Sequence, residues 1–211
     1  IGFFPDVGAT WLLSHAPGEL GTYMGLTGEA IGPADAIAAG FADCFVPADA
    51  LTRLAEELAA LHATADAGAV STLIAAFAGE APAGHFIENR AIIDRCFAFD
   101  TAEDILAALE EEKSPFADKT RATLLTKSPT SLKVTLALLR AGRSSPELEA
   151  CLAREFAATA QTLKTPDFYE GIRAAIIDKD RNPKWSPATL DEVGPEIVEA
   201  FFQPHPQPLF G

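Results

Sequence analysis

Apolar side chains recur at intervals of three and four residues along most of this chain, which is the period of a helix with one buried face. The clearest stripe is Leu51, Leu54, Leu58 and Leu61. A longer stripe, from Leu148 to Leu163, predicts a helix of about twenty residues. The pattern therefore predicts a mainly α protein.

Hydroxyl–proline pairs divide the second half of the chain into helices. A Ser or Thr side chain can cap a helix N-terminus, and proline fits the first helical position because its missing N–H would have no partner there. Each pair therefore predicts the start of a helix, and Thr101, with an acid three residues later, predicts one more. The pairs are Ser114-Pro115, Ser128-Pro129, Ser145-Pro146 and Thr165-Pro166.

Shorter elements are predicted in the first hundred residues. The segment Phe41–Val46 is the best strand candidate, because it is short, apolar and bounded by Gly40 and Pro47. The other predicted elements are helices. They lie near 11–17, 20–26 with an end at Gly28, 33–40, 51–61, 70–78 and 86–96.

Composition excludes several classes of function. Sixteen Lys and Arg residues against 30 Asp and Glu residues give a net charge of −14, which repels nucleic-acid phosphates. No apolar run approaches the ~20 residues that span a bilayer, so no membrane segment is expected. The three cysteines are widely spaced, and no two of the four histidines have a ligand spacing, so we expect no metal site.

Asp6 is the most suggestive residue for chemistry. It lies between Pro5 and Gly8 in an apolar segment just before a predicted helix. Proline fixes the backbone there, and glycine allows a ligand to approach closely. A carboxylate in such a place can do acid/base work or bind a substrate hydroxyl. The alternative is that Asp6 only caps the following helix.

The order of the motifs resembles that of the 3-hydroxyisobutyryl-CoA hydrolases, which belong to the crotonase (enoyl-CoA hydratase/isomerase) superfamily. Segments 1–8, 26–28, 36–40 and 45–47 are similar to crotonases in general. Two further blocks resemble the hydrolase branch more specifically. They are Lys-Ser-Pro-Thr-Ser-Leu-Lys-Val-Thr at 127–135 and Asp-Phe-Tyr-Glu-Gly-Ile-Arg-Ala at 167–174, which continues to Pro183-Lys184-Trp185.

The resemblance covers nearly the whole chain and implies the C-terminal part of the enzyme. The expected fold is the end of the crotonase α/β spiral followed by a helical region, with few strands present. The implied division is residues 1–63 for the last turns of the spiral, 64–202 for the helical region and 203–211 for a Pro-rich tail. The family's catalytic glutamate would lie three residues before Ile1, and its oxyanion-hole loops earlier still.

The implied chemistry is hydrolysis of 3-hydroxyisobutyryl-CoA to 3-hydroxyisobutyrate and CoA in valine breakdown, with no cofactor beyond the CoA of the substrate. Asp6 matches the family's second carboxylate, which contacts the substrate hydroxyl. Phe4, Pro5, Gly8 and Trp11 are candidate substrate-binding residues, and Trp11 would narrow the acyl pocket. The absent glutamate and oxyanion donors imply that the 211-residue chain alone is inactive.

Two alternatives to the hydrolase stay open. One is an enoyl-CoA hydratase or isomerase, although these enzymes usually pair two glutamates where the hydrolases have an Asp. The other is a non-catalytic helical interaction fragment. The expected partners are an acyl-CoA, the N-terminal half of the enzyme and further copies of the chain. The expected location is the bacterial cytoplasm, with the mitochondrial matrix as the alternative.

Overall fold

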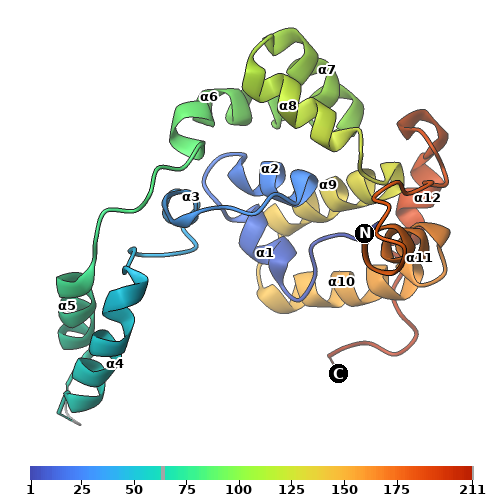
Figure 1. Cartoon of the computed structure of the whole chain (residues 1–211). Helices are drawn as coiled ribbons and strands as arrows, with labels where there is room; N and C mark the ends of the chain where they lie inside the picture. The colour runs from blue at the N-terminus through green and yellow to red at the C-terminus, as the bar shows by residue number, and fades with distance from the viewer. Residues whose placement is uncertain (63–64, 211) are drawn as a thin grey trace. The chain divides into compact units, whose positions relative to one another are not determined.

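Helices form the regular structure of this protein, as the spacing of apolar residues predicts. The computed structural model describes residues 1–62 and 65–210, and within them it has twelve α-helices and no β-strand (Figure 1). None of the helices in these ranges is both long and apolar enough to cross a membrane. The α-helices are α1 (Ala9–Ser14), α2 (Leu20–Thr27), α3 (Pro33–Ala38), α4 (Leu51–Ala60), α5 (Ala67–Phe77), α6 (Phe86–Cys96), α7 (Ala102–Glu112), α8 (Pro115–Leu124), α9 (Pro129–Arg143), α10 (Leu148–Thr162), α11 (Pro166–Ile172) and α12 (Pro195–Ala200).

The chain divides into two compact units, which we describe separately. The first consists of residues 1–29 and 89–211, and the second of residues 30–88. The division that the family resemblance implies is a different one. Its first boundary falls on residues 63–64, which lie outside the described residues, and the division at 202 stays a prediction.

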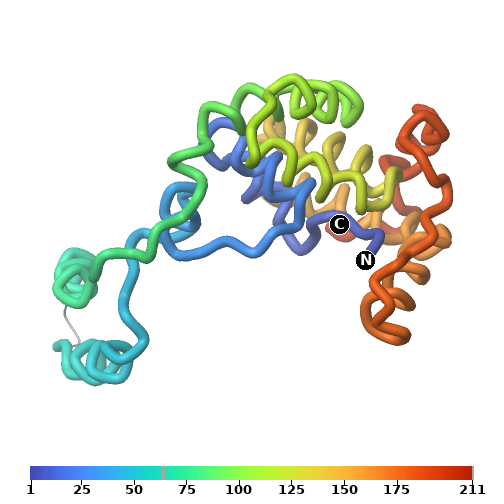
Figure 2. The backbone as a smooth tube through the Cα atoms, turned by 45° about the horizontal axis from the view of Figure 1, so that its top comes forward, coloured from blue at the N-terminus to red at the C-terminus, as the bar shows by residue number. Residues whose placement is uncertain are grey.

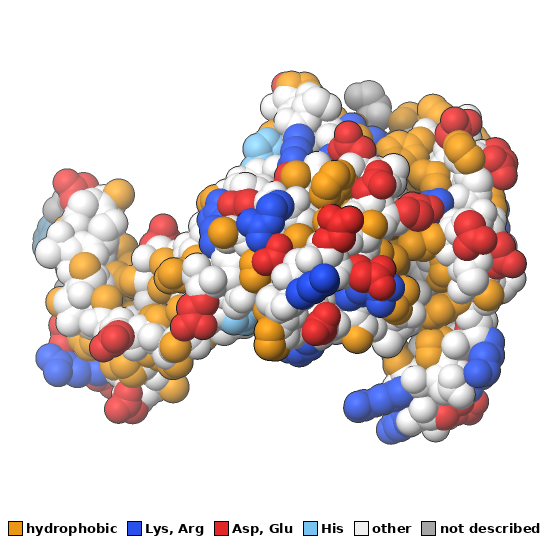
Figure 3. All heavy atoms as spheres, turned by 90° about the horizontal axis from the view of Figure 1, so that it is seen from above, with side chains coloured by type: hydrophobic (Ala, Val, Ile, Leu, Met, Phe, Trp, Pro, Cys, Tyr) orange, Lys and Arg blue, Asp and Glu red, His pale blue; other side chains and the backbone are white. Residues whose placement is uncertain are grey.

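Helix α9 is the centre of the first unit. It contacts α1, α2, α7, α10 and α12, so segments from both ends of the chain meet on it. Figures 1 and 2 show α1 and α2 against α9, with the α7–α8 pair on the α2 side. Val134, Leu138 and Leu139 of α9 are almost fully buried. On the face that Figure 3 shows, acidic and basic side chains are interspersed over the first unit.

Two glycines allow α1 to approach its neighbours closely. A Cβ atom on Gly21 of α2 would lie 1.7 Å from the Leu13 carbonyl oxygen of α1. A Cβ atom on Gly142 of α9 would lie 2.9 Å from the Thr10 carbonyl oxygen of α1. Both distances to backbone atoms are shorter than van der Waals contact, so only glycine fits. Helix α1 is therefore held between α2 and α9 by backbone-level contact.

Most predicted helix starts are confirmed. Thr101, Ser114 and Ser128 each accept a hydrogen bond from the backbone N–H three residues later, as N-cap residues do. Helix α11 also begins at the predicted proline, Pro166, although the Thr165 hydroxyl donates to the Thr162 carbonyl instead of capping. Helix α2 ends at Gly28, whose φ of 61° suits glycine.

The predicted start at Ser145-Pro146 is wrong. Helix α10 begins two residues later, at Leu148, and has 15 residues rather than about twenty. The Ser145 hydroxyl donates 2.9 Å back to the Ala141 carbonyl of α9. The Ser145 side chain therefore bonds to the end of α9, although it was expected to cap the start of α10.

The predicted strand Phe41–Val46 in the second unit is also wrong. Phe45 forms only an isolated antiparallel bridge with Gly79, through a 2.9 Å bond from the Gly79 N–H. A strand needs a partner over several residues, and the described part of this unit provides one bridge only. Helices α4 and α5 pack together here, and the buried Asp35 accepts from the His85 and Phe86 N–H groups at the start of α6.

We expect Gly21→Ala to lower the free energy of unfolding by about 1–3 kcal/mol or more, because the added methyl group meets the Leu13 backbone and cannot be accommodated by a rotamer change. Gly32→Ala is the matched control, since a Cβ atom there meets nothing within 4 Å. Urea denaturation of both variants tests the prediction. Equal effects of the two substitutions would contradict the close packing of α1 on α2.

Candidate functional site

The segment that carries Asp6 is anchored in the hydrophobic core through Phe4, two residues before it. Phe4 is buried in a cluster with Val134 and Leu138 of α9, together with Ala158 and Phe201. The Phe3 ring stacks on the Phe4 ring with 4.5 Å between centroids. The hydrophobic pattern of residues 1–4 therefore fixes where the following turn lies.

The buried carboxylate of Glu155 holds the residues that follow Asp6 through hydrogen bonds. Its side chain comes from the middle of α10, and the residue is 3% exposed. The Gly8 N–H donates to Glu155 Oε2 at 2.7 Å, and the Thr10 N–H donates to Oε1 at 2.9 Å. The Thr10 hydroxyl donates to the same Oε1. A residue distant in sequence thus supplies acceptors for the N–H groups at the start of α1, a helix end that otherwise lacks them.

Asp6 does not cap α1. Gly8 is the N-cap residue of this helix, and Glu155 takes the N–H groups that a capping side chain would bind. The Asp6 backbone carbonyl accepts from the Ala9 N–H at 2.9 Å. Its partly exposed carboxylate makes no hydrogen bond or ion pair with any residue that the structure describes. The carboxylate is therefore available to a ligand.

The turn beside Asp6 has an unusual backbone. Val7 has a φ of 52° and is 86% exposed, and Gly8 has a φ of 89°. A left-handed φ is rare for a β-branched residue and costs free energy, which the surrounding contacts must offset. Such strain is concentrated at functional sites in proteins, and here it lies next to the unpaired carboxylate.

The other residues predicted to bind substrate divide into two groups. Pro5, Gly8 and Trp11 lie with Asp6 in the partly exposed turn and the first turn of α1. The Trp11 ring lies against the His15 ring, with centroids 4.0 Å apart. Phe4 instead lies in the core cluster. Their contacts with a substrate stay predictions.

Asp167 joins the two sequence blocks that resemble the hydrolases. This buried carboxylate accepts from the Ser128 hydroxyl at 2.6 Å and from the Ser186 N–H at 2.7 Å. The same helix also supports the chain before Asp6. A Cβ atom on Gly2 would lie 2.4 Å from the Asp167 carbonyl oxygen, and one on Gly171 would lie 2.3 Å from the Ile1 carbonyl carbon.

Arg173 begins a π-helical turn, Arg173–Ile177, directly after α11, and its side chain organises the loop beyond that turn. Its guanidinium donates to Glu170, Asp178 and Asp180 and to the Asn182 carbonyl. Hydrogen bonds from Arg173 and from the Lys184 N–H lower the pKa of Glu170 to about 2. Two acids of the charged run at 178–181, Asp178 and Asp180, are thus held by this arginine.

Sequence reasoning identified Asp6 but missed its support. Nothing in the spacing of α10 shows that Glu155 is buried, because acids at helical intervals are usually exposed. For a metal, the described residues contain no group of three or more His, Cys, Asp or Glu side chains placed to hold one ion.

Comparison with known proteins agrees with the resemblance. The profile of the family described as enoyl-CoA hydratase/isomerase matches residues 1–202. The 3-hydroxyisobutyryl-CoA hydrolase 1 of Arabidopsis thaliana is 38% identical over 96% of this chain and 56% of its own length. The mitochondrial 3-hydroxyisobutyryl-CoA hydrolase of Rattus norvegicus is 38% identical over 96% of this chain and 54% of its own length. The chain thus spans about half the length of these curated relatives.

Two solved structures share the fold. A carnitinyl-CoA dehydratase from Mycobacterium thermoresistibile is 42% identical, with a TM-score of 0.89 over 99% of this chain and 58% of that one. An enoyl-CoA hydratase from Rhodobacter sphaeroides 2.4.1 is 39% identical, with a TM-score of 0.86 over 100% of this chain and 59% of that one. The predicted fold class, a mainly helical part of a crotonase, is confirmed.

We expect Glu155→Ala to lower the free energy of unfolding by about 2–4 kcal/mol, because it leaves the buried donors of Gly8 and Thr10 without an acceptor. Glu155→Gln keeps one oxygen acceptor, and its effect should be smaller. Glu149→Ala is the control, since Glu149 is exposed on the same helix. Thermal and urea unfolding measure all three. A loss no larger for Glu155→Ala than for Glu149→Ala would contradict the role of Glu155.

Proposed function

Because this chain belongs to the enoyl-CoA hydratase/isomerase family, we propose that its protein hydrolyses a short branched hydroxyacyl-CoA thioester, with 3-hydroxyisobutyryl-CoA as the substrate. The observation that carries the proposal is the unpaired carboxylate of Asp6 in a strained turn that the core holds in place. The names of the curated relatives support the choice of a hydrolase.

In the proposed reaction, water adds to the thioester carbonyl and CoA leaves as the thiol. Asp6 accepts a hydrogen bond from the substrate hydroxyl and supports proton transfer. Glu155 fixes the Gly8 and Thr10 backbone, so the turn next to Asp6 need not be ordered when the substrate binds. The proposal assigns the glutamate and the N–H donors for the carbonyl oxygen to the half of the relatives that this chain does not span.

A hydratase is the second candidate, and the two solved structures favour it, because one is an enoyl-CoA hydratase and the other is a carnitinyl-CoA dehydratase. Both reactions begin with a CoA thioester whose carbonyl is polarised. They differ in the bond that forms, because hydration adds water across a carbon–carbon double bond and leaves the thioester intact. The products therefore distinguish the two candidates directly.

For the full-length protein, including the half that the relatives have beyond this chain, we expect release of CoA from 3-hydroxyisobutyryl-CoA to be faster than hydration of crotonyl-CoA. A thiol reagent measures the first rate, and the loss of enoyl absorbance measures the second. Dominant hydration would overturn the hydrolase assignment in favour of the second candidate.

We expect Asp6→Asn to lower turnover of the full-length protein by roughly 10²-fold or more, because an amide cannot take up a proton as a carboxylate does. Stability should be unchanged, since the Asp6 side chain bonds no described residue. Asp118→Asn, an exposed acid of α8, is the control for charge. Near-normal turnover of Asp6→Asn would contradict a role of Asp6 in the reaction.

A further inference from the structure

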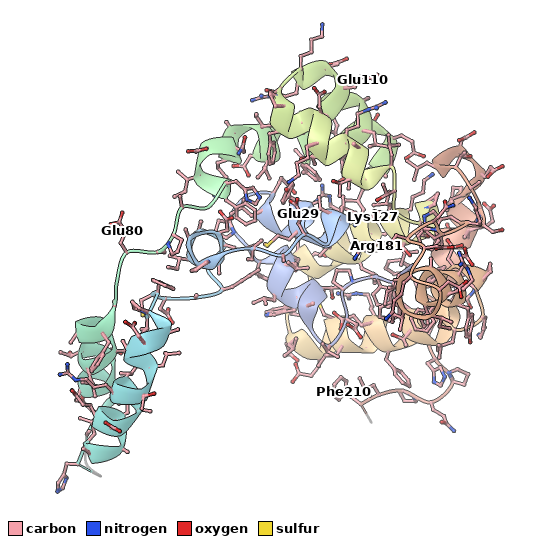
Figure 4. All side chains as sticks on the ribbon, viewed as in Figure 1. Glu29, Glu80, Glu110, Lys127, Arg181 and Phe210 are labelled. Carbon is pink, nitrogen blue, oxygen red and sulfur yellow. The ribbon has the colours of Figure 1, made fainter. Side chains whose placement is uncertain are left out.

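A cavity of about 200 Å³ lies at the start of α9, apart from the Asp6 turn. Ser131 and Thr135, four residues apart on one face of α9, line it, and so does Lys127, which directly precedes the N-cap residue Ser128. The residues 25–28 at the C-terminal end of α2 and the backbone near Gly2 also line it, and Trp185 contributes a side chain. Figure 4 shows Lys127 where the end of α2 meets the beginning of α9.

The Lys127 ammonium has no direct partner in the described part of the chain. It makes no hydrogen bond or ion pair with any residue that the structure describes. The acid whose field reaches it, Glu29, is already engaged by the Lys119 ammonium at 2.8 Å and by the Tyr23 hydroxyl. Burial lowers the pKa of Lys127, and the field of Glu29 opposes this shift. A half-buried cation therefore faces the cavity without a bound counter-charge.

Two hydroxyl groups that line the cavity with Lys127 also make no hydrogen bond to a described residue. Thr135 is 2% exposed, yet its hydroxyl has no hydrogen-bond partner among the described residues, and neither has that of Ser131. Ser128 at the same place shows the contrast, because its hydroxyl donates to Asp167 and accepts from the Ser131 N–H. A hydroxyl that lines a cavity without a bond to a described residue can donate to a ligand, and the resulting hydrogen bond would stabilise the bound ligand.

We propose that this cavity binds a small oxyanion, a carboxylate or a phosphate, through the Lys127 ammonium and the hydroxyls of Ser131 and Thr135. A cation and neutral hydroxyl donors select an anion with several acceptor oxygens, and charge-assisted hydrogen bonds are the stronger kind. The cavity volume limits the ligand to a small molecule or to the end of a larger one. This inference goes beyond thioester hydrolysis and is independent of it, because binding is measured without turnover.

Isothermal titration of the full-length protein tests the proposal with two probes, inorganic phosphate and acetate. We expect saturable binding of at least one probe, and the tighter one identifies the class of oxyanion. Lys127→Gln should weaken that binding about tenfold or more, whereas Lys127→Arg, which keeps the charge, should weaken it less. Thr135→Val should weaken it roughly three- to tenfold.

Lys164→Gln is the matched control, because it removes the same charge from an exposed position after α10. Its affinity should equal that of the unchanged protein, and thermal unfolding shows whether each variant keeps its fold. Absence of saturable binding of both probes would overturn the proposal. So would a folded Lys127→Gln variant that binds as well as the unchanged protein, or a Lys164→Gln variant that is weakened equally.

Discussion

The candidate site depends on the hydrogen bonds that the buried carboxylate of Glu155 accepts from the start of α1. A carboxylate at 3% exposure is costly unless it is well bonded, and here the Gly8 and Thr10 backbone and the Thr10 hydroxyl all donate to it. The same bonds fix the first turn of α1. The strained backbone at Val7 can persist because bonds from Gly8 and Thr10 to Glu155 and the burial of Phe4 in the core hold the chain on either side of it.

Helix α9 gives the site a rigid base. Its buried face meets α1, α2, α10 and α12, and its N-cap residue Ser128 is bonded to Asp167 of α11. The glycines at 21 and 142 bring α1 into backbone contact with its neighbours. Residues from both ends of the chain therefore meet in one packed layer beneath the turn that carries Asp6.

The sequence predicted most helices correctly because their signals are local. Hydroxyl caps at Thr101, Ser114 and Ser128 and the glycine stop at Gly28 act within one turn. The errors arose where a non-local contact decided the outcome. Ser145 bonds back to α9 and does not cap α10, and within residues 1–62 and 65–210 Phe45 forms a single bridge, with Gly79.

One part of the candidate site, Asp6, could be predicted from the sequence, whereas its support by Glu155 could not. Asp6 was identified from the turn residues on either side of it and from the family resemblance. Glu155 could not be identified, because its burial results from the packing of α10 on α1 and leaves no mark in the spacing of the sequence. The junction of Ser128 with Asp167 joins two recognised blocks through a contact 39 residues apart, which no local pattern reveals.

The central claim is that Glu155 acts on the chemistry by positioning Asp6, and a double-mutant cycle on turnover tests it most directly. Turnover is measured for Glu155→Gln, for Asp6→Asn and for the double variant of the full-length protein, all under conditions where each is folded. Our account predicts that Glu155→Gln lowers turnover when Asp6 is present and has little further effect once Asp6 is replaced. Independent, multiplicative losses in the double variant would contradict it.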